Sequence, residues 1–224
     1  MDEIQIIEAL TKYLLERGVE FSEDGFPIFQ AQWIIEDLPD AIVPFSKRHY
    51  FKIDKKKVSI CFFENDKLLY PRFNKLFKEI ETLEQYHSVC MMDISVSPFM
   101  FDCVQETNLL INMLYSCVLA TNGIKIIPSF RSGSFETIQI LTRNIGQVDY
   151  WIMGAIGTQK VKKNVYLDYL FESKCLILMP KRILIYGKPS KSTISCLNEY
   201  GIKYSIYKDF RYLSYKKEKQ YVGF

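Results

Sequence analysis

The first feature along the chain is a set of apolar residues that recur at three- and four-residue steps. These residues are Ile4, Ile7, Leu10 and Leu14. The spacing is typical of the buried face of an amphipathic helix, and a glycine just beyond the last apolar position is a common helix end. Because Gly18 stands at that place, the sequence predicts an N-terminal helix over residues 1–18.

Beyond a polar, acidic connection, short runs rich in β-forming residues alternate with helical patterns. The expected strands cover residues 41–45, 58–63, 88–92, 124–127, 150–153, 182–186 and 203–207. This alternation is typical of βα units around a parallel sheet. We therefore expect an α/β fold with a mostly parallel sheet of about seven strands and helical crossovers. The pattern fits an incomplete or irregular (β/α) barrel as well as an open doubly wound sheet.

The helices between these strands carry recognisable start and stop signals. We expect Pro71 to begin one helix, because proline fits the first helical turn, with an apolar face made of Phe73, Leu76, Phe77, Ile80 and Leu83. Further helices are expected over residues 103–122, after a cap at Ser132 or Ser134, over 164–179 and over 192–200. The composition near the end of 164–179 fits a strand or a helix, and we favour a helix.

Length and composition set the domain organisation. The chain has 224 residues, 48% of them hydrophobic, which is enough for one sizeable core. It shows neither an internal repeat nor a linker rich in Pro, Gly or Ser, so we expect a single α/β domain over residues 1–224. Within it we distinguish the N-terminal helix (1–18), a core (40–190) and a basic, Tyr-rich C-terminal segment (203–224).

Several features indicate a cytoplasmic protein without a membrane partner. The chain starts Met-Asp-Glu, which is acidic where a secretory leader is basic. Its longest apolar run, from Leu109 to Ala120, is interrupted by Asn112 and Ser116 and is shorter than the roughly 20 residues of a membrane span. The six cysteines are scattered singly, without a C-x-x-C pair, and are expected to act as small hydrophobic residues rather than zinc ligands or nucleophiles.

Short motifs at the ends of the expected strands carry a resemblance to a known family. They are Val43-Pro44-Phe45-Ser46, Cys61-Phe62-Phe63-Glu64-Asn65-Asp66, Asp93-Ile94-Ser95, Asn122-Gly123-Ile124-Lys125-Ile126-Ile127-Pro128 and Ile185-Tyr186-Gly187. In this order and spacing the chain resembles the domain of unknown function 4417 family, over roughly residues 40–190. The resemblance implies a protein of bacteria, phages or mobile elements and assigns no activity. Departures from the family pattern are Met92 and Ile94 beside the aspartate, Asn65 in place of an acidic residue, Arg131 near an expected Trp, and Met113 near an expected Arg.

Acidic side chains follow two neighbouring strands. In parallel sheets and barrels, ligands bind at the carboxyl ends of the strands. Asp66 and Asp93 are our preferred catalytic pair, because two nearby carboxylates could hold Mg²⁺ for phosphodiester or nucleotide chemistry, or share acid and base roles in glycosidic cleavage. The competing interpretation is that Asp93 caps a loop by accepting backbone N–H bonds and that Glu64 and Asp66 lie in a solvated turn.

Other polar residues at strand ends are candidates for substrate binding. They are Glu64, Ser95, Arg131, Thr158 and Tyr186. Arg131 lies in the segment Ser129–Ser134, whose composition suits phosphate binding by backbone N–H groups and one guanidinium, although it also fits an ordinary strand-to-helix turn. The segment lacks the lysine and the spacing of a P-loop.

The C-terminal segment has a charge pattern of its own. Residues 203–224 contain six basic and two acidic residues, with five tyrosines interleaved. Such a mixture suits phosphate contacts and base stacking, so we expect Lys208, Arg211, Lys216 and Lys217 to bind nucleic acid. The alternative is a solvated or partner-docking tail.

Two functional hypotheses remain open at this stage. The first is a phage or mobile-element accessory protein that acts on or binds nucleotides or nucleic acid through the strand-end acidic site. The second is a non-catalytic accessory or anti-defence factor that binds a host or phage protein, since aromatic residues are enriched in interface cores.

Overall fold

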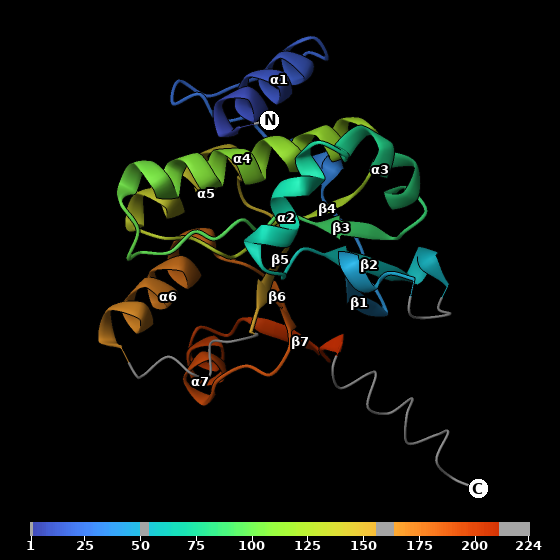
Figure 1. The fold of residues 1–224 in the computed structure, drawn as a ribbon. Helices are drawn as coiled ribbons and strands as arrows, with labels where there is room; N and C mark the ends of the chain where they lie inside the picture. Colours follow the sequence, from blue (N-terminus) through green and yellow to red (C-terminus); the bar gives the residue numbers. More distant parts are fainter. Residues whose placement is uncertain (1, 50–53, 156–163, 211–224) are drawn as a thin grey trace, which may run out of the picture.

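The computed structural model describes residues 2–49, 54–155 and 164–210. Helices and strands alternate through most of the chain (Figure 1). The strands are β1 (Ala41–Pro44), β2 (Val58–Cys61), β3 (Ser88–Cys90), β4 (Ile126–Ile127), β5 (Tyr150–Gly154), β6 (Arg182–Tyr186) and β7 (Lys203–Tyr207). The helices are α1 (Glu3–Leu15), α2 (Asp66–Phe73), α3 (Leu76–Leu83), α4 (Asp102–Thr121), α5 (Phe135–Ile145), α6 (Val165–Leu178) and α7 (Lys191–Glu199). The expected α/β fold with seven strands is confirmed.

The strands lie side by side in chain order. A four-stranded parallel sheet has the order β1-β2-β3-β4 and a three-stranded parallel sheet the order β5-β6-β7. A parallel bridge between Ser129 and Ile152 connects the two sheets, with hydrogen bonds from Phe130 N to Ile152 O (2.7 Å) and from Ile152 N to Pro128 O (2.9 Å). A doubly wound sheet reverses its strand order at a switch point. The strand order here does not reverse, so it is the order found in a barrel.

The sheet curls without closing. Within the described residues no ladder joins β7 to β1, so the barrel stays open along that side. The two strands nevertheless come close, because the Tyr207 hydroxyl donates to the carbonyl of Pro39, just before β1, at 2.9 Å. The structure is therefore an irregular, open βα barrel rather than a flat sheet.

Alternate residues of each strand enter two separate apolar clusters, as the two-residue period of a strand requires. One cluster packs against the helices and includes Val43, Ile60, Val89, Ile126, Trp151 and Ile183. The other lies on the opposite, inner face and includes Ile42, Cys61, Cys90, Ile127, Ile152, Leu184 and Tyr186, with Tyr207 packed against it. Every strand contributes to this inner cluster.

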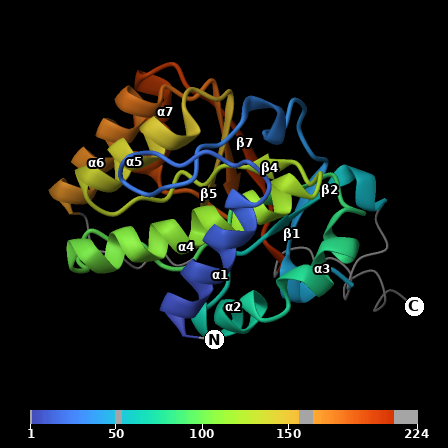
Figure 2. The ribbon, with the colours of Figure 1, turned by 90° about the horizontal axis from the view of Figure 1, so that it is seen from above.

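The connections outside the sheet differ from the expected ones at two points. Figure 2 shows α1 crossing α4 on the outer side of the molecule. Helix α1 buries Ile6, Leu10 and Leu14, whereas Ile4 is 69% exposed, so the prediction that Ile4 faces the core is wrong.

The start of α2 also differs from the prediction, because Pro71 lies inside α2 and does not begin it. Asn65 begins that helix instead, because its side chain accepts from Lys67 N at 3.0 Å, the usual role of an asparagine cap.

The expected helix over residues 164–179 is confirmed as α6. The apolar face expected to follow Pro71 is divided between α2 and α3, and Phe77, one of its members, is 52% exposed and packs on Tyr13 of α1. No helix in the described part of the chain is long and apolar enough to cross a membrane.

Candidate functional site

Asp93 lies just beyond β3, in an extended segment at the carboxyl ends of the strands. Its side chain is 3% exposed. A buried segment needs partners for its backbone polar groups. Although Met91 N still donates to Ile127 O of β4, the next residues take their partners from side chains of α4.

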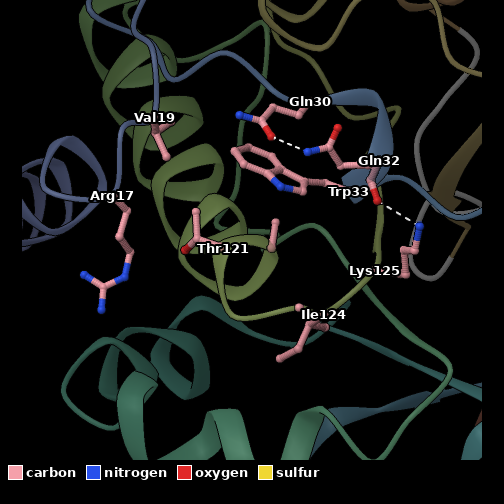
Figure 3. A pocket seen from close by; sticks show the side chains of 10 residues that line it. Arg17, Val19, Gln30, Gln32, Trp33, Thr121, Ile124 and Lys125 are labelled. Carbon is pink, nitrogen blue, oxygen red and sulfur yellow. Dashed lines mark hydrogen bonds between the residues drawn. The ribbon is translucent and has the colours of Figure 1, made fainter.

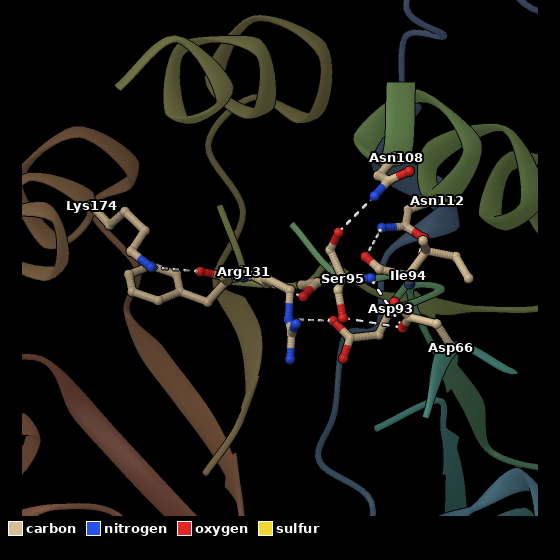
Figure 4. Close-up of polar contacts among 10 residues, drawn as sticks. Asp66, Asp93, Ile94, Ser95, Asn108, Asn112, Arg131 and Lys174 are labelled. Atoms are coloured by element: carbon tan, nitrogen blue, oxygen red, sulfur yellow. Dashed lines mark hydrogen bonds and ion pairs between the residues drawn. The ribbon is translucent and has the colours of Figure 1, made fainter. Parts of the chain in front are cut away.

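Three polar residues of α4, spaced four apart on one helix face, supply these partners. The Ser116 hydroxyl accepts from Met92 N at 3.0 Å. The Asn112 amide accepts from Ile94 N at 2.8 Å and donates to Ile94 O at 2.9 Å, and Asn108 donates to Ser95 O at 2.8 Å. This α4 polar stripe (Asn108, Asn112 and Ser116) fixes the backbone on both sides of Asp93. Figure 4 shows the contacts of Asn108 and Asn112 with the backbone that follows Asp93.

Arg131, which follows β4, forms an ion pair with Asp93. Its Nε lies 2.8 Å from Asp93 Oδ1, and the arginine side chain is 38% exposed. The N–H is not aligned with that oxygen, which has no hydrogen-bond partner among the described residues. The terminal nitrogens of Arg131 make no contact of hydrogen-bond length with any residue that the structure describes. Arg131 thus contacts the buried carboxyl group of Asp93 while part of its own side chain is exposed to solvent.

The environment of Asp93 brings the pKa of its carboxyl group close to neutral pH. Burial raises the pKa of its carboxyl group to about 7. The positive charge of Arg131 lowers this pKa, and the negative charge of Asp66 raises it, but desolvation has the largest effect. A group with such a pKa can both donate and accept a proton near pH 7, the property that acid–base catalysis and proton-linked binding require.

Asp66, the other member of the predicted pair, lies at the first position of α2. Its Oδ1 accepts from the backbone N and the hydroxyl of Ser95, at 3.2 and 3.1 Å. Asp66 therefore joins α2 to the segment that carries Asp93. The described residues contain no group of three or more His, Cys, Asp or Glu side chains that could hold a metal ion. One or two carboxylates are the protein ligands that Mg²⁺ commonly takes beside water and phosphate, and the same two groups also suit proton transfer and ionic recognition.

Glu64 and Tyr186 have partners of their own at the ends of β2 and β6. Glu64 accepts from the backbone N of Ser46 at 3.1 Å and from its hydroxyl. The Tyr186 side chain is fully buried, stacks on Phe63 at 5.8 Å and accepts from Phe210 N at 3.0 Å. Glu64 is therefore bound to Ser46, and Tyr186 to Phe63 and Phe210, whereas Asp93 pairs with Arg131.

Of the remaining predicted residues, some lie in the described part of the chain and others lie outside it. The Ser129 hydroxyl accepts from Arg131 N at 3.2 Å, and Ser134 caps α5 without a side-chain hydrogen bond. Lys208 follows β7 at its carboxyl end. Thr158, Arg211, Lys216 and Lys217 lie outside the described residues.

Lys174 of α6 is a cation near the site that we did not single out from the sequence. Its Nζ donates to the carbonyl of Phe130 at 3.2 Å and lies over the rings of Phe130 and Phe171, 5.2 and 5.8 Å from their centroids. Burial lowers its pKa to about 8. Phe130 directly precedes Arg131, so Lys174 supports the backbone that presents the guanidinium. The available sequence signal was a lysine directly before the apolar residues 175–179 at the end of an expected helix.

A cavity of about 490 Å³ lies at the other end of the strands, where α1 and α4 end and β4 begins (Figure 3). Its lining includes Arg17, Trp33 and Lys125. Lys125 Nζ already donates to Gln32 O at 2.8 Å and to Glu36 at 3.0 Å. The cavity contains none of the predicted site residues.

The strand order and the ion pair together define an open parallel α/β barrel protein with a buried carboxyl–guanidinium pair at the carboxyl ends of its strands. Residues 27–205 match the family described as Domain of unknown function (DUF4417), and the chain belongs to this family. The family description names no activity, and α1 precedes the matched region. Neither the curated proteins nor the solved structures include a match to the chain.

Proposed function

We propose that this protein binds nucleotides or nucleic acid at the carboxyl-end site, where Arg131 holds a phosphate group and Asp93 exchanges a proton. The observation that carries the proposal is the Asp93–Arg131 pair, with a buried carboxyl group and an arginine side chain that is 38% exposed. Arginine binds phosphate through two parallel N–H bonds. Nε faces Asp93, and neither terminal nitrogen contacts a residue within 2–49, 54–155 or 164–210, so both are available to such a ligand with respect to that part of the chain.

The proposal includes a link between binding and proton uptake. An anion beside Arg131 offsets the positive charge that lowers the pKa of Asp93. Binding should therefore raise this pKa further and favour the protonated carboxyl group. It follows that the affinity for phosphate groups is higher below pH 7 than above it.

The experiment is a thermal-shift panel of nucleoside monophosphates, short single strands and short duplexes, because a ligand that binds only the folded state raises the melting temperature. Arg131→Met should abolish the shift, and Asp93→Asn should remove its pH dependence. Arg143→Met is the matched control, since Arg143 is an exposed arginine of α5 paired with Asp24 and Glu136. A full shift in Arg131→Met, or no shift with any ligand, would refute the proposal.

We further propose a cytoplasmic setting and an accessory role in a phage or other mobile element. The reducing cytoplasm is supported by the six cysteines, all of them free thiols. The mobile-element role is supported by the family resemblance alone. Its test is expression of the chain in bacterial cells, followed by fractionation to locate it and by a comparison of phage propagation with and without it.

The alternative function is non-catalytic binding of a host or phage protein. Large apolar side chains exposed beside the carboxyl-end site favour it, because such groups are enriched at protein interfaces. Under this alternative, Asp93→Asn and Arg131→Met leave the biological effect of the protein intact, whereas loss of the exposed rings removes it.

A further inference from the structure

Five aromatic side chains are exposed on three consecutive connections at the carboxyl ends of the strands. They are Phe99, Phe101, Phe135, Tyr166 and Tyr169, and they are between 44% and 83% exposed. The first two follow β3, Phe135 follows β4, and the two tyrosines follow β5. We call this set the aromatic rim.

The first two parts of the rim are held together by Gln105 of α4. Its amide donates to Met100 O at 2.9 Å, between the two phenylalanines, and accepts from Ser134 N at 2.5 Å, directly before Phe135. Gly133 allows this contact, because a Cβ at that position would overlap the Gln105 amide oxygen. The tyrosines are on α6, which packs against α5, where Phe135 is the first residue. The rim is thus part of a fixed framework.

Arg131 lies four residues before Phe135, in the same connection. Exposed rings in the same connection as a guanidinium whose terminal nitrogens contact none of the described residues match the chemistry of single-stranded nucleic acid, whose bases stack on aromatic faces and whose phosphates bind cations. The acidic residues next to Phe101 and Phe135 have partners, since Asp102 accepts from Gln105 at 3.4 Å and Glu136 pairs with Arg143 at 3.1 Å. Asp168 is the acidic residue between the two tyrosines.

We propose that the aromatic rim is a docking surface for single-stranded nucleic acid, with bases stacked on its rings and a phosphate bound by Arg131. The inference rests on the proposed function and deepens it, because it selects the single strand over a free nucleotide or a duplex. A free nucleotide has one base and engages one ring at most. A duplex keeps its base faces inside the helical stack.

The test is fluorescence anisotropy of a labelled oligothymidylate of about twelve nucleotides, within the range of known single-strand sites. Wild type, Phe101→Ala and Phe135→Ala are compared with Phe77→Ala, which removes a 52% exposed ring from α3, outside the rim. Each rim substitution should weaken binding at least about fivefold, the loss expected for one stacked base. Phe77→Ala should bind as wild type does.

Thymidine monophosphate and a duplex of equal length serve as competitors. Efficient competition by the duplex, or unchanged binding by both rim variants, overturns the rim inference and leaves the proposed function intact. Binding of the monophosphate without binding of the single strand also overturns the rim inference and leaves the proposed function intact. If wild type binds neither, both proposals fail and the rim is assigned to a protein partner.

Discussion

Asn112 offers the sharpest test of how the fold holds Asp93 in place. Its side chain makes two hydrogen bonds to the backbone of Ile94, and both residues are buried. In Asn112→Leu the N–H and C=O of Ile94 stay buried without partners, at a cost of about 1–3 kcal/mol each. The larger apolar side chain returns about 1–2 kcal/mol. We therefore expect the free energy of unfolding to fall by about 2–4 kcal/mol.

Urea denaturation at pH 7 measures this change. Thr107→Val is the control, because Thr107 also belongs to α4 but its hydroxyl donates only to Cys103 O of its own helix. Asn112→Asp adds a second readout, since a protonated aspartate can still donate to Ile94 O and an ionised one cannot. That variant should be close to wild type at low pH and strongly destabilised at pH 8. If the free energy of unfolding of Asn112→Leu lies within about 0.5 kcal/mol of the wild-type value, as is usual for a surface substitution, the assigned role of Asn112 is wrong.

Three further predictions follow from individual contacts. The folded pKa of Asp93, about 7, lies above its ordinary value of 3.8, so the folded chain keeps a proton that the unfolded chain releases. Wild-type stability should therefore fall as pH rises from about 4 to about 7, and urea titrations should show this fall absent in Asp93→Asn. Gly154→Ala places a Cβ 2.9 Å from the Phe63 ring and should cost about 1–3 kcal/mol, which Phe63→Leu in the same chain should largely restore in a double-mutant cycle. Gly133→Ala should displace Gln105 and weaken oligonucleotide binding in the anisotropy assay without altering nucleotide-induced thermal shifts.

The strands were predictable because each is a short apolar run between turn signals. Residues 182–186 and 203–207 match β6 and β7 at both ends. The strand order was not predictable, because local patterns do not say which strands pair, and both a barrel and a doubly wound sheet remained open. Pro71 was misplaced because the cap formed by Asn65 determines where α2 begins, and proline is tolerated within its short length.

The candidate site was predictable in position but not in its contacts. The rule that parallel strands present ligands at their carboxyl ends selected Asp93 and Arg131, yet their ion pair depends on the adjacency of β3 and β4. Asn112 was noted only as an interruption of an apolar run. Its spacing from Asn108 and Ser116 carried the available signal, since polar residues four apart in a buried helix share one face.

Among the residues that the structure describes, β1 and β7 are the edge strands on the open side of the barrel, and edge strands can recruit another chain. Pro44 removes one backbone donor from β1, a common safeguard at an edge. Across the gap, the Tyr207 hydroxyl is joined to the carbonyl of Pro39 by one side-chain hydrogen bond in place of a ladder. Widening the barrel there breaks this hydrogen bond, whereas separating neighbouring strands within either sheet breaks a ladder of backbone hydrogen bonds.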